Sequence, residues 1–282
     1  MSPLISAAEL ASILQSGNLI LIDVRSGPGA RERYLSAHLP GARHTDLERD
    51  LSVPPADAAQ GGRHPLPAPP SFGELLGRLG IIPSSHVIVY DDKHGAMAAA
   101  RFWWMLKAAG HEKVQVLNGG LQAAERLGLP LTGEITAFDP ASPYPVSEWK
   151  LPMADIETVA DAAADPERMV LDVREAYRYR GESEPIDLVA GHIPGAVNLP
   201  YVENLDDQGL FLSPAALAEK YSALLNGLQP SQLIVHCGSG VTACHTLLAL
   251  SSAGLQGAAL YVGSWSEWSR NDRPIASSGN SK

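Results

Sequence analysis

One cysteine, Cys237, stands where a sequence can build a reactive thiol. It follows the β-branched apolar run Leu233–Val235, precedes a glycine-spaced loop, and is followed by a helical pattern that starts near Thr242. Backbone N–H groups and a helix N-terminus aimed at one sulfur stabilise a thiolate and hold an anion beside it. A cysteine that only fills a core needs no glycines beside it, whereas a loop that approaches a ligand does. We therefore predict that Cys237 is a nucleophile.

The loop after the cysteine is predicted to bind the group that is transferred. Its residues are Gly238, Ser239, Gly240, Val241 and Thr242, and their N–H groups are expected to surround an atom attached to the sulfur. The same segment, HCGSGVTA, matches the cysteine phosphatase motif (His-Cys, five residues, Arg) at every position except the arginine. Ala243 stands where those enzymes need an arginine to bind the phosphoryl group. Phosphatase or arsenate reductase activity is therefore a disfavoured alternative hypothesis. Cys244, inside an apolar helix, is expected to be structural.

Two further side chains are candidates for the same chemistry. Arg178 has no counterpart in the first half of the chain and is a candidate for binding an anion, while Arg174 has a twin in Arg25 that suggests a shared structural ion pair. His64 sits in the long loop GGRHPLP and could move a proton, since histidine titrates near neutral pH. His38 recurs in both halves, as His192, and is expected to fix a loop.

The elements that position these residues form an internal repeat. Three segments of the first half correspond, in the same order, to three of the second: LILIDVRSG to MVLDVREAY, AHLPGAR to GHIPGAV, and VIVYDDKHG to LIVHCGSGV. In each copy, short β-branched runs alternate with helical patterns such as 96–109 and 242–253, which predicts an α/β fold with a mostly parallel sheet flanked by helices. Ligands in such folds bind at the carboxyl ends of strands, where Cys237 stands.

The repeat also predicts the domain organisation. We expect an N-terminal domain over residues 1–135, a proline-rich linker over 136–152, and a catalytic domain over 153–282. In the first copy, Asp91 occupies the position of Cys237. A carboxylate cannot do thiolate chemistry, so we expect the first domain to be catalytically silent.

Composition restricts the partners. The formal net charge of −10 argues against nucleic acid and anionic membranes, which both require clustered basic residues. Two cysteines suit a reducing compartment, and the N-terminus has no signal-peptide pattern, so we expect a cytoplasmic protein that spans no membrane.

Over nearly its whole length, the chain resembles the tandem-domain sulfurtransferases of the rhodanese superfamily. The resemblance lies in the paired DVR and H-[LI]-P-G-A motifs, the loop CGSGVTA and the segment YVGSWSEW. It implies that Cys237 accepts sulfur as a persulfide, that Arg178 binds the donor's carboxylate, and that Ser239 relays protons with His64. The uncharged loop resembles that of enzymes using 3-mercaptopyruvate more than that of enzymes using thiosulfate.

One position departs from that pattern. Mercaptopyruvate enzymes usually carry a second arginine about nine residues after the first, where this chain has Ile186. Both donors therefore stay open. The expected reaction passes sulfur from the donor to a thiol or cyanide, with a thioredoxin-like protein as one possible acceptor, in a monomer that needs no metal or organic cofactor. A persulfide carrier or redox sensor with little turnover is the alternative.

Overall fold

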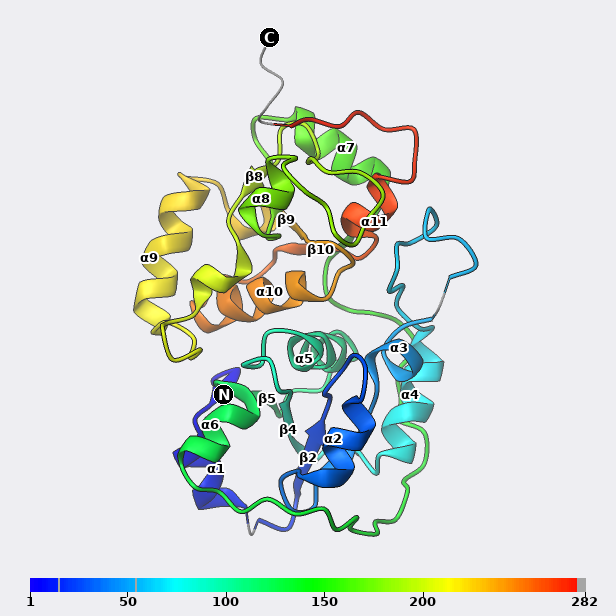
Figure 1. Ribbon diagram of the computed structural model, residues 1–282, viewed down its shortest axis with the longest axis vertical. Helices are drawn as coiled ribbons and strands as arrows, with labels where there is room; N and C mark the ends of the chain where they lie inside the picture. The colour runs from blue at the N-terminus through cyan, green and yellow to red at the C-terminus, as the bar shows by residue number, and fades with distance from the viewer. Residues whose placement is uncertain (15, 54, 278–282) are drawn as a thin grey trace. The chain divides into compact units, whose positions relative to one another are not determined.

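The computed structural model describes residues 1–14, 16–53 and 55–277, which form two compact units. The first comprises Met1–Val53, Leu66–Lys150 and Asp207–Phe211, and the second Pro54–Pro65, Leu151–Asp206 and Leu212–Lys282. Each unit has its own five-stranded parallel sheet (Figure 1). This arrangement confirms the predicted α/β class, with two tandem units that each contain a parallel sheet.

The two sheets have the same strand order. In the first unit the order is β1-β5-β4-β2-β3, and in the second it is β6-β10-β9-β7-β8. The strands of the first sheet are β1 (Leu4–Ile5), β2 (Leu19–Asp23), β3 (Arg43–His44), β4 (His86–Tyr90) and β5 (Val114–Leu117). Those of the second are β6 (Met153–Ala154), β7 (Met169–Asp172), β8 (Val197–Asn198), β9 (Leu233–His236) and β10 (Ala259–Tyr261).

Helices cover both faces of the first sheet because alternate strand residues point to opposite faces. Leu21, Ile88 and Leu117 join Leu10 and Leu121 of two helices in one buried cluster, while another helix contacts β4 and β5. The helices are α1 (Ala7–Ile13), α2 (Ala30–Ser36), α3 (Leu47–Asp50), α4 (Pro69–Arg78), α5 (Ala98–Ala108) and α6 (Gly120–Arg126). Helix α1 contributes Leu10 and helix α6 contributes Leu121 to the buried cluster. Together with α5, which contacts β4 and β5, these two helices bury the central strands.

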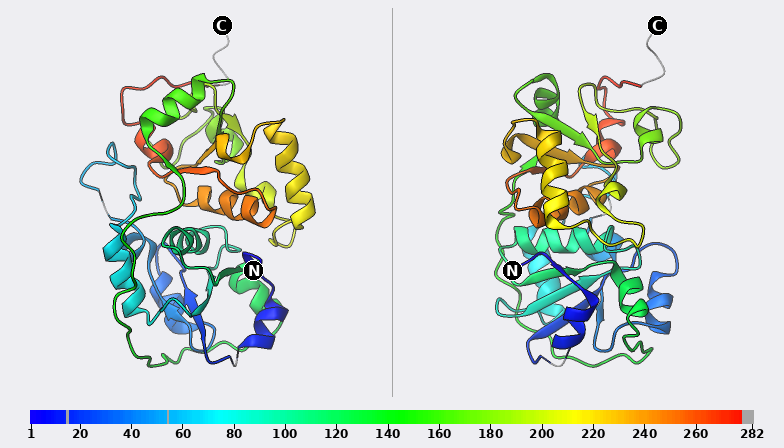
Figure 2. Two further views of the ribbon diagram at one scale, coloured as in Figure 1. Left: turned by 180° about the vertical axis from the view of Figure 1, so that it is seen from behind. Right: turned by 90° about the vertical axis from the view of Figure 1, so that its left-hand side faces the viewer.

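The second unit repeats this layering. Val159 of one helix packs with Val170, Ile234 and Trp265 in one buried cluster. On the cysteine side, α10 contacts β9, β10 and α9 (Figure 2). The helices are α7 (Ile156–Ala164), α8 (Ala176–Tyr179), α9 (Pro214–Leu225), α10 (Thr242–Ser252) and α11 (Ser264–Trp268), with 3₁₀ turns at Tyr201–Asn204 and Pro230–Gln232.

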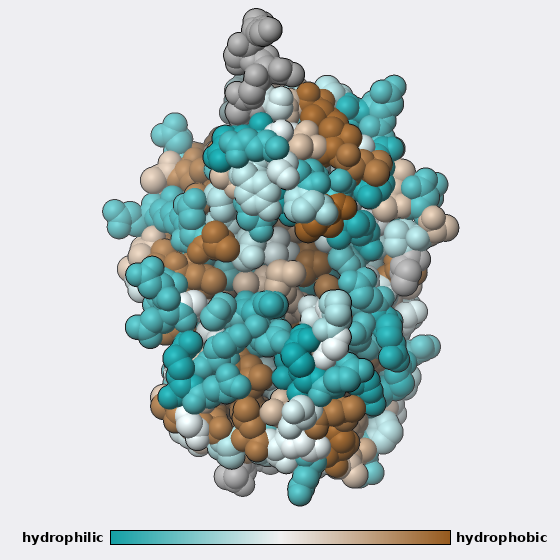
Figure 3. Space-filling view, viewed as in Figure 1, coloured by the Kyte–Doolittle hydropathy of each residue, from teal (hydrophilic) through white to brown (hydrophobic). Residues whose placement is uncertain are grey.

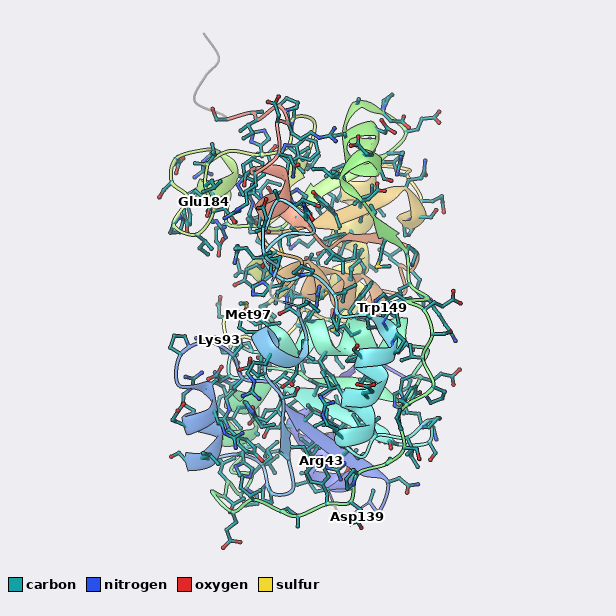
Figure 4. All side chains as sticks on the ribbon, turned by 90° about the vertical axis from the view of Figure 1, so that its right-hand side faces the viewer. Arg43, Lys93, Met97, Asp139, Trp149 and Glu184 are labelled. Carbon is teal, nitrogen blue, oxygen red and sulfur yellow. The ribbon has the colours of Figure 1, made fainter. Side chains whose placement is uncertain are left out.

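The compact units differ from the sequence-based division in three segments. Residues 55–65 pack with the second unit although they lie in the first copy, and residues 207–211 pack with the first. Most of the proline-rich stretch expected as a linker, up to Lys150, packs on the first unit, where Trp149 contacts the rings of Phe72 and Trp104 (Figure 4). Hydrophobic patterning could not indicate this, because these segments carry no periodicity.

The duplicated motifs have the same structural role in both units. Arg25 binds Asp23 at 2.7 Å, and its twin Arg174 binds Asp172 at 2.5 Å, with all four side chains buried. The ring of His192 stacks on Tyr179 and bonds to its carbonyl, as its twin in the first unit does on a tyrosine. The expected ion pair and the loop-fixing histidines are confirmed.

The surface on the side drawn in Figure 3 is mostly hydrophilic with smaller hydrophobic patches, as a chain with 18% charged residues leads one to expect. Within the described ranges, no helix has both the length and the apolar composition that crossing a bilayer requires.

Candidate active site

Cys237 directly follows β9 and lies at the carboxyl edge of the second sheet, as predicted. Its thiol is free and its residue is 2% exposed. Two backbone contacts attach it to α11: its N–H donates to Ser264 Oγ at 3.2 Å, and its carbonyl accepts from the Trp265 N–H at 3.0 Å. Ser264 itself has a φ of +54°, an uncommon conformation for a residue with a β-carbon. The two hydrogen bonds to α11 therefore fix the backbone of the cysteine, and the surrounding contacts hold Ser264 in this conformation.

The two loop glycines have different structural reasons. Gly240 has a φ of +73°, and a β-carbon built on it would lie 2.5 Å from the Val262 carbonyl oxygen, so only glycine fits. At Gly238 the nearest groups are charged: a β-carbon would lie 3.2 Å from Arg63 Nη2 and 3.4 Å from Arg178 Nη2. Gly238 thus leaves room beside the cysteine at a place where two guanidinium groups approach.

His64 contacts the cysteine loop. Its Nδ1 lies 2.7 Å from Ser239 Oγ, in a hydrogen bond between two buried side chains. The segment 55–65 carries it there, since the Arg63 N–H donates to Ser266 Oγ at 3.0 Å and Gly62 lies against the Gly263 backbone too closely for any β-carbon. The structure therefore brings together the histidine and the serine that the sequence placed 175 positions apart.

Arg178 is held by carboxylates. Its Nη2 and Nε donate to Glu184 at 2.7–3.1 Å, and its Nη1 lies 3.3 Å from Glu175. Burial would lower the pKa of Arg178, but the bonds and attraction to Glu184 outweigh it and raise that pKa. For Glu184, burial would raise the pKa, and the same pair with Arg178 lowers it. Both groups are ionised at neutral pH, and Arg178 keeps one fixed orientation.

A buried carboxylate near the loop joins three arginines. Asp187, whose side chain is fully buried, lies 3.0 Å from Arg63 Nε, 3.1 Å from Arg270 Nη1 and 3.5 Å from Arg178 Nη2. We call these four residues the Asp187 cluster. Sequence reasoning missed Asp187, Arg63 and Arg270. The one available signal was that Arg63 directly precedes His64.

Behind the cysteine, His236 ends β9 with its ring fully buried. Its Nε2 is 3.8 Å from Asp172 Oδ2. Burial lowers the pKa of His236 more than the attraction to Asp172 raises it, so the imidazole is neutral at neutral pH. The Arg174 guanidinium lies 4.5 Å above the Trp265 ring, and this contact holds α11 to the ion pair of Arg174 and Asp172. These buried contacts hold the end of β9 and helix α11 together beside the cysteine loop.

The remaining loop residues lie at the start of the helix that the sequence predicted near Thr242. Val241 precedes α10, Thr242 is its first residue, and Ala243 is buried within it. Cys244 is also buried in α10 and donates its thiol to the Gly240 carbonyl at 3.3 Å, as expected of a structural cysteine. Throughout the part of the chain that the structure describes, no cluster of three His, Cys, Asp or Glu side chains is placed to hold a metal ion.

In the first unit, Asp91 occupies the equivalent position after β4. Its buried carboxylate accepts four backbone N–H bonds, from Lys93, Gly95, Met97 and Ala99, at 2.8–3.1 Å (Lys93 and Met97 are labelled in Figure 4). Complete burial raises the pKa of Asp91, although the four N–H groups act to lower it. The side chain itself fills the loop that an anion could otherwise enter.

Comparisons with known proteins agree with this architecture. The rhodanese-like domain family matches twice, at residues 6–126 and 155–271. A protein of Pseudomonas aeruginosa named as a probable 3-mercaptopyruvate sulfurtransferase is 43% identical over 280 residues, which cover 97% of each chain. The thiosulfate sulfurtransferase of Mus musculus is 36% identical over 286 residues, covering 96% of this chain and 93% of the relative.

A solved structure agrees as well. The 3-mercaptopyruvate sulfurtransferase of Escherichia coli superimposes with a TM-score of 0.78 at 31% identity, over 95% of this chain and all of the other. The two matched regions, the repeated sheet order and the cysteine after β9 all have the same explanation: this chain belongs to the rhodanese family and is a two-domain sulfurtransferase.

Proposed function

We propose that Cys237 carries the transferred sulfur as a persulfide and that 3-mercaptopyruvate is the preferred donor. The observation that carries the choice of donor is the 2.7 Å contact between His64 Nδ1 and Ser239 Oγ beside the cysteine loop. Relatives are named for both 3-mercaptopyruvate and thiosulfate, so the site itself has to distinguish the two donors.

In the first step, the Cys237 thiolate attacks the thiol sulfur of 3-mercaptopyruvate. The new S–S bond forms as the C–S bond breaks, and the bonding electrons leave with the carbon as the enolate of pyruvate. Loop N–H groups and the N-terminus of the eleven-residue helix α10 stabilise the negative charge on sulfur. Arg178, fixed by Glu184, is proposed to bind the donor's carboxylate.

The proton balance favours mercaptopyruvate over thiosulfate. Sulfur arrives from mercaptopyruvate with its proton, and the leaving enolate must gain a proton at carbon to become pyruvate. The pair of Ser239 and His64 can pass that proton from the new persulfide to the leaving group. Thiosulfate leaves sulfite, which needs no proton, so a proton relay at this place would serve that donor little.

In the second step, an acceptor thiolate or cyanide attacks the outer sulfur of the persulfide. The S–S bond breaks, the Cys237 thiolate returns, and the cycle needs no net redox change when cyanide is the acceptor. With a thiol acceptor, the product is the acceptor's persulfide, and a second thiol of a thioredoxin-like protein can release sulfide from it. We propose such a protein as one acceptor, and a monomer working in the reducing cytoplasm, where Cys237 stays a free thiol.

Steady-state turnover with each donor tests this proposal. The rate of pyruvate formation from 3-mercaptopyruvate and of thiocyanate formation from thiosulfate gives kcat/KM for both. We expect kcat/KM for 3-mercaptopyruvate to be at least about 10-fold higher, because only that donor uses the relay. A higher value for thiosulfate would refute the donor assignment. Turnover of neither donor, with a persulfide still forming, would make the protein a carrier.

A further inference from the structure

Arg63 lies close to the loop and has the most exposed side chain of the three arginines in the Asp187 cluster. Its Nη2 is the nearest group to the vacant side of Gly238, the residue after the nucleophile. The side chain is 26% exposed, compared with 7% for Arg178. Its Nε and Nη2 donate to Asp187, and within the described residues no protein group accepts from its Nη1.

Around the loop, guanidinium groups outnumber the buried carboxylates. Four guanidinium groups, those of Arg63, Arg174, Arg178 and Arg270, meet three buried carboxylates, those of Asp172, Asp187 and Glu184. The fourth carboxylate, Glu175, is 39% exposed, so solvent screens its attraction for Arg178. Although the chain has a net charge of −10, the guanidinium groups here outnumber the buried carboxylates, and this favours binding of an anion.

We propose that Arg63 is the second guanidinium that binds the anionic group of the sulfur donor, in the role left open by Ile186. Ile186 is 54% exposed and cannot donate a hydrogen bond from its side chain. Asp187, the next residue, turns inward and binds Arg63 from a position 124 residues away in sequence. The inference rests on the proposed function, since it names the residue that, with Arg178, recognises the donor's carboxylate.

Asp187 explains why Arg63 is suited to this task. A carboxylate that receives Nε and Nη2 fixes the plane of the guanidinium and leaves the Nη1 edge directed elsewhere. Arg270 shares Asp187 but also donates to the Ser266 carbonyl, which ties it to α11. Arg180 pairs with Glu182 on the surface and offers a control for the loss of one positive charge in this unit.

The test is a comparison of Arg63→Gln with wild type and with Arg180→Gln, using 3-mercaptopyruvate and its uncharged methyl ester as donors. Removing a charge-assisted hydrogen bond to the carboxylate should raise KM for 3-mercaptopyruvate about 10- to 100-fold. We expect kcat to change less than about 3-fold, and the ester to lose less than about 3-fold in kcat/KM. Arg180→Gln should match wild type with both donors.

Several outcomes would overturn the inference. An unchanged KM for 3-mercaptopyruvate in Arg63→Gln would do so. An equal fall of kcat with both donors, with a shifted pH profile, would show that Arg63 only positions its neighbour His64. If Arg63→Gln does not fold, Arg63→Lys decides, because a lysine lacks the fork that Asp187 orients and should raise KM about 3- to 10-fold; an unchanged KM refutes the role.

A separate binding measurement keeps this inference distinct from the proposed function. Pyruvate is titrated into wild type and Arg63→Gln, and its dissociation constant is measured by calorimetry. If wild type turns over neither donor, the proposed function fails, while the anion site is still judged by pyruvate. At least about 10-fold weaker pyruvate binding in the variant supports Arg63, and equal binding overturns it.

Discussion

Replacing Asp91 by asparagine should destabilise the first unit without affecting catalysis. The Asp91 carboxylate is 1% exposed and accepts four N–H bonds from the loop that corresponds to the catalytic one. In asparagine, one oxygen can keep two of these bonds, and the amide NH₂ faces the other two donors. Leaving two buried N–H groups unsatisfied costs about 1–3 kcal/mol each, or about 2–6 kcal/mol in total.

The titration of Asp91 reduces that loss at neutral pH. Burial raises its pKa in the folded protein above the unfolded value, so the folded state binds the proton more tightly. The group therefore stabilises the fold most below a pH of about 4 and less as pH rises through the raised pKa. Asparagine does not titrate, so the loss of stability in Asp91→Asn should be larger at acid pH than at pH 7.

Urea unfolding and hydrogen exchange of residues 93–99 measure this loss, and donor turnover measures catalysis. The control is Asp92→Asn, which removes a partly exposed pair with Arg33 at 2.9 Å and should cost less than about 1 kcal/mol. We expect kcat/KM of Asp91→Asn to stay within about 2-fold of wild type. A 10-fold loss of kcat in the folded variant would refute the silent role of the first unit, and unchanged stability would refute the N–H contacts as its anchor.

Three further substitutions test the second unit. Gly240→Ala should lower kcat and cost about 1–3 kcal/mol of stability, because its φ is +73° and the new methyl would meet the Val262 carbonyl; full activity in steady-state assays would contradict this. His64→Gln should lower kcat with 3-mercaptopyruvate about 100-fold but with thiosulfate less than about 5-fold, and an equal loss with both donors would speak against the relay. For Asp172, burial raises the pKa, but the charge and hydrogen bonds of Arg174 oppose it and the pKa is lowered. Its stabilising contribution is therefore present above a pH of about 4 and lost as pH falls below it. The stability of Asp172→Asn, measured by circular dichroism, should fall less steeply than that of wild type as the pH is lowered below about 4. The same pH dependence in both proteins would contradict this.

Much of the fold could be predicted from the sequence because its signals are local. β-Branched runs such as those ending at Tyr90 and His236 are followed by helical patterns, and this alternation requires parallel sheets. The internal repeat aligned Asp91 with Cys237, and the structure has the same strand order around both. The buried pairs of the two DVR motifs followed from the same comparison.

The site could be predicted only where its residues are adjacent in sequence. The loop after Cys237 is one contiguous segment, whereas Asp187 and Arg63 meet only because the 55–65 segment folds onto the second unit. That segment has no hydrophobic period, and its attachment depends on backbone fit at Gly62. The sequence shows that Ile186 stands where an arginine is usual in mercaptopyruvate enzymes. It could not show which other guanidinium groups lie close to the cysteine loop.

Intact-protein mass spectrometry after incubation with 3-mercaptopyruvate, without an acceptor, tests the persulfide on Cys237 most directly. Wild type should gain about 32 Da, the mass of one sulfur atom, and lose it again when cyanide is added. Cys237→Ser should stay folded and gain nothing, while Cys244→Ser should behave as wild type does, since Cys244 is buried in α10. A mass gain that persists in Cys237→Ser would contradict the account.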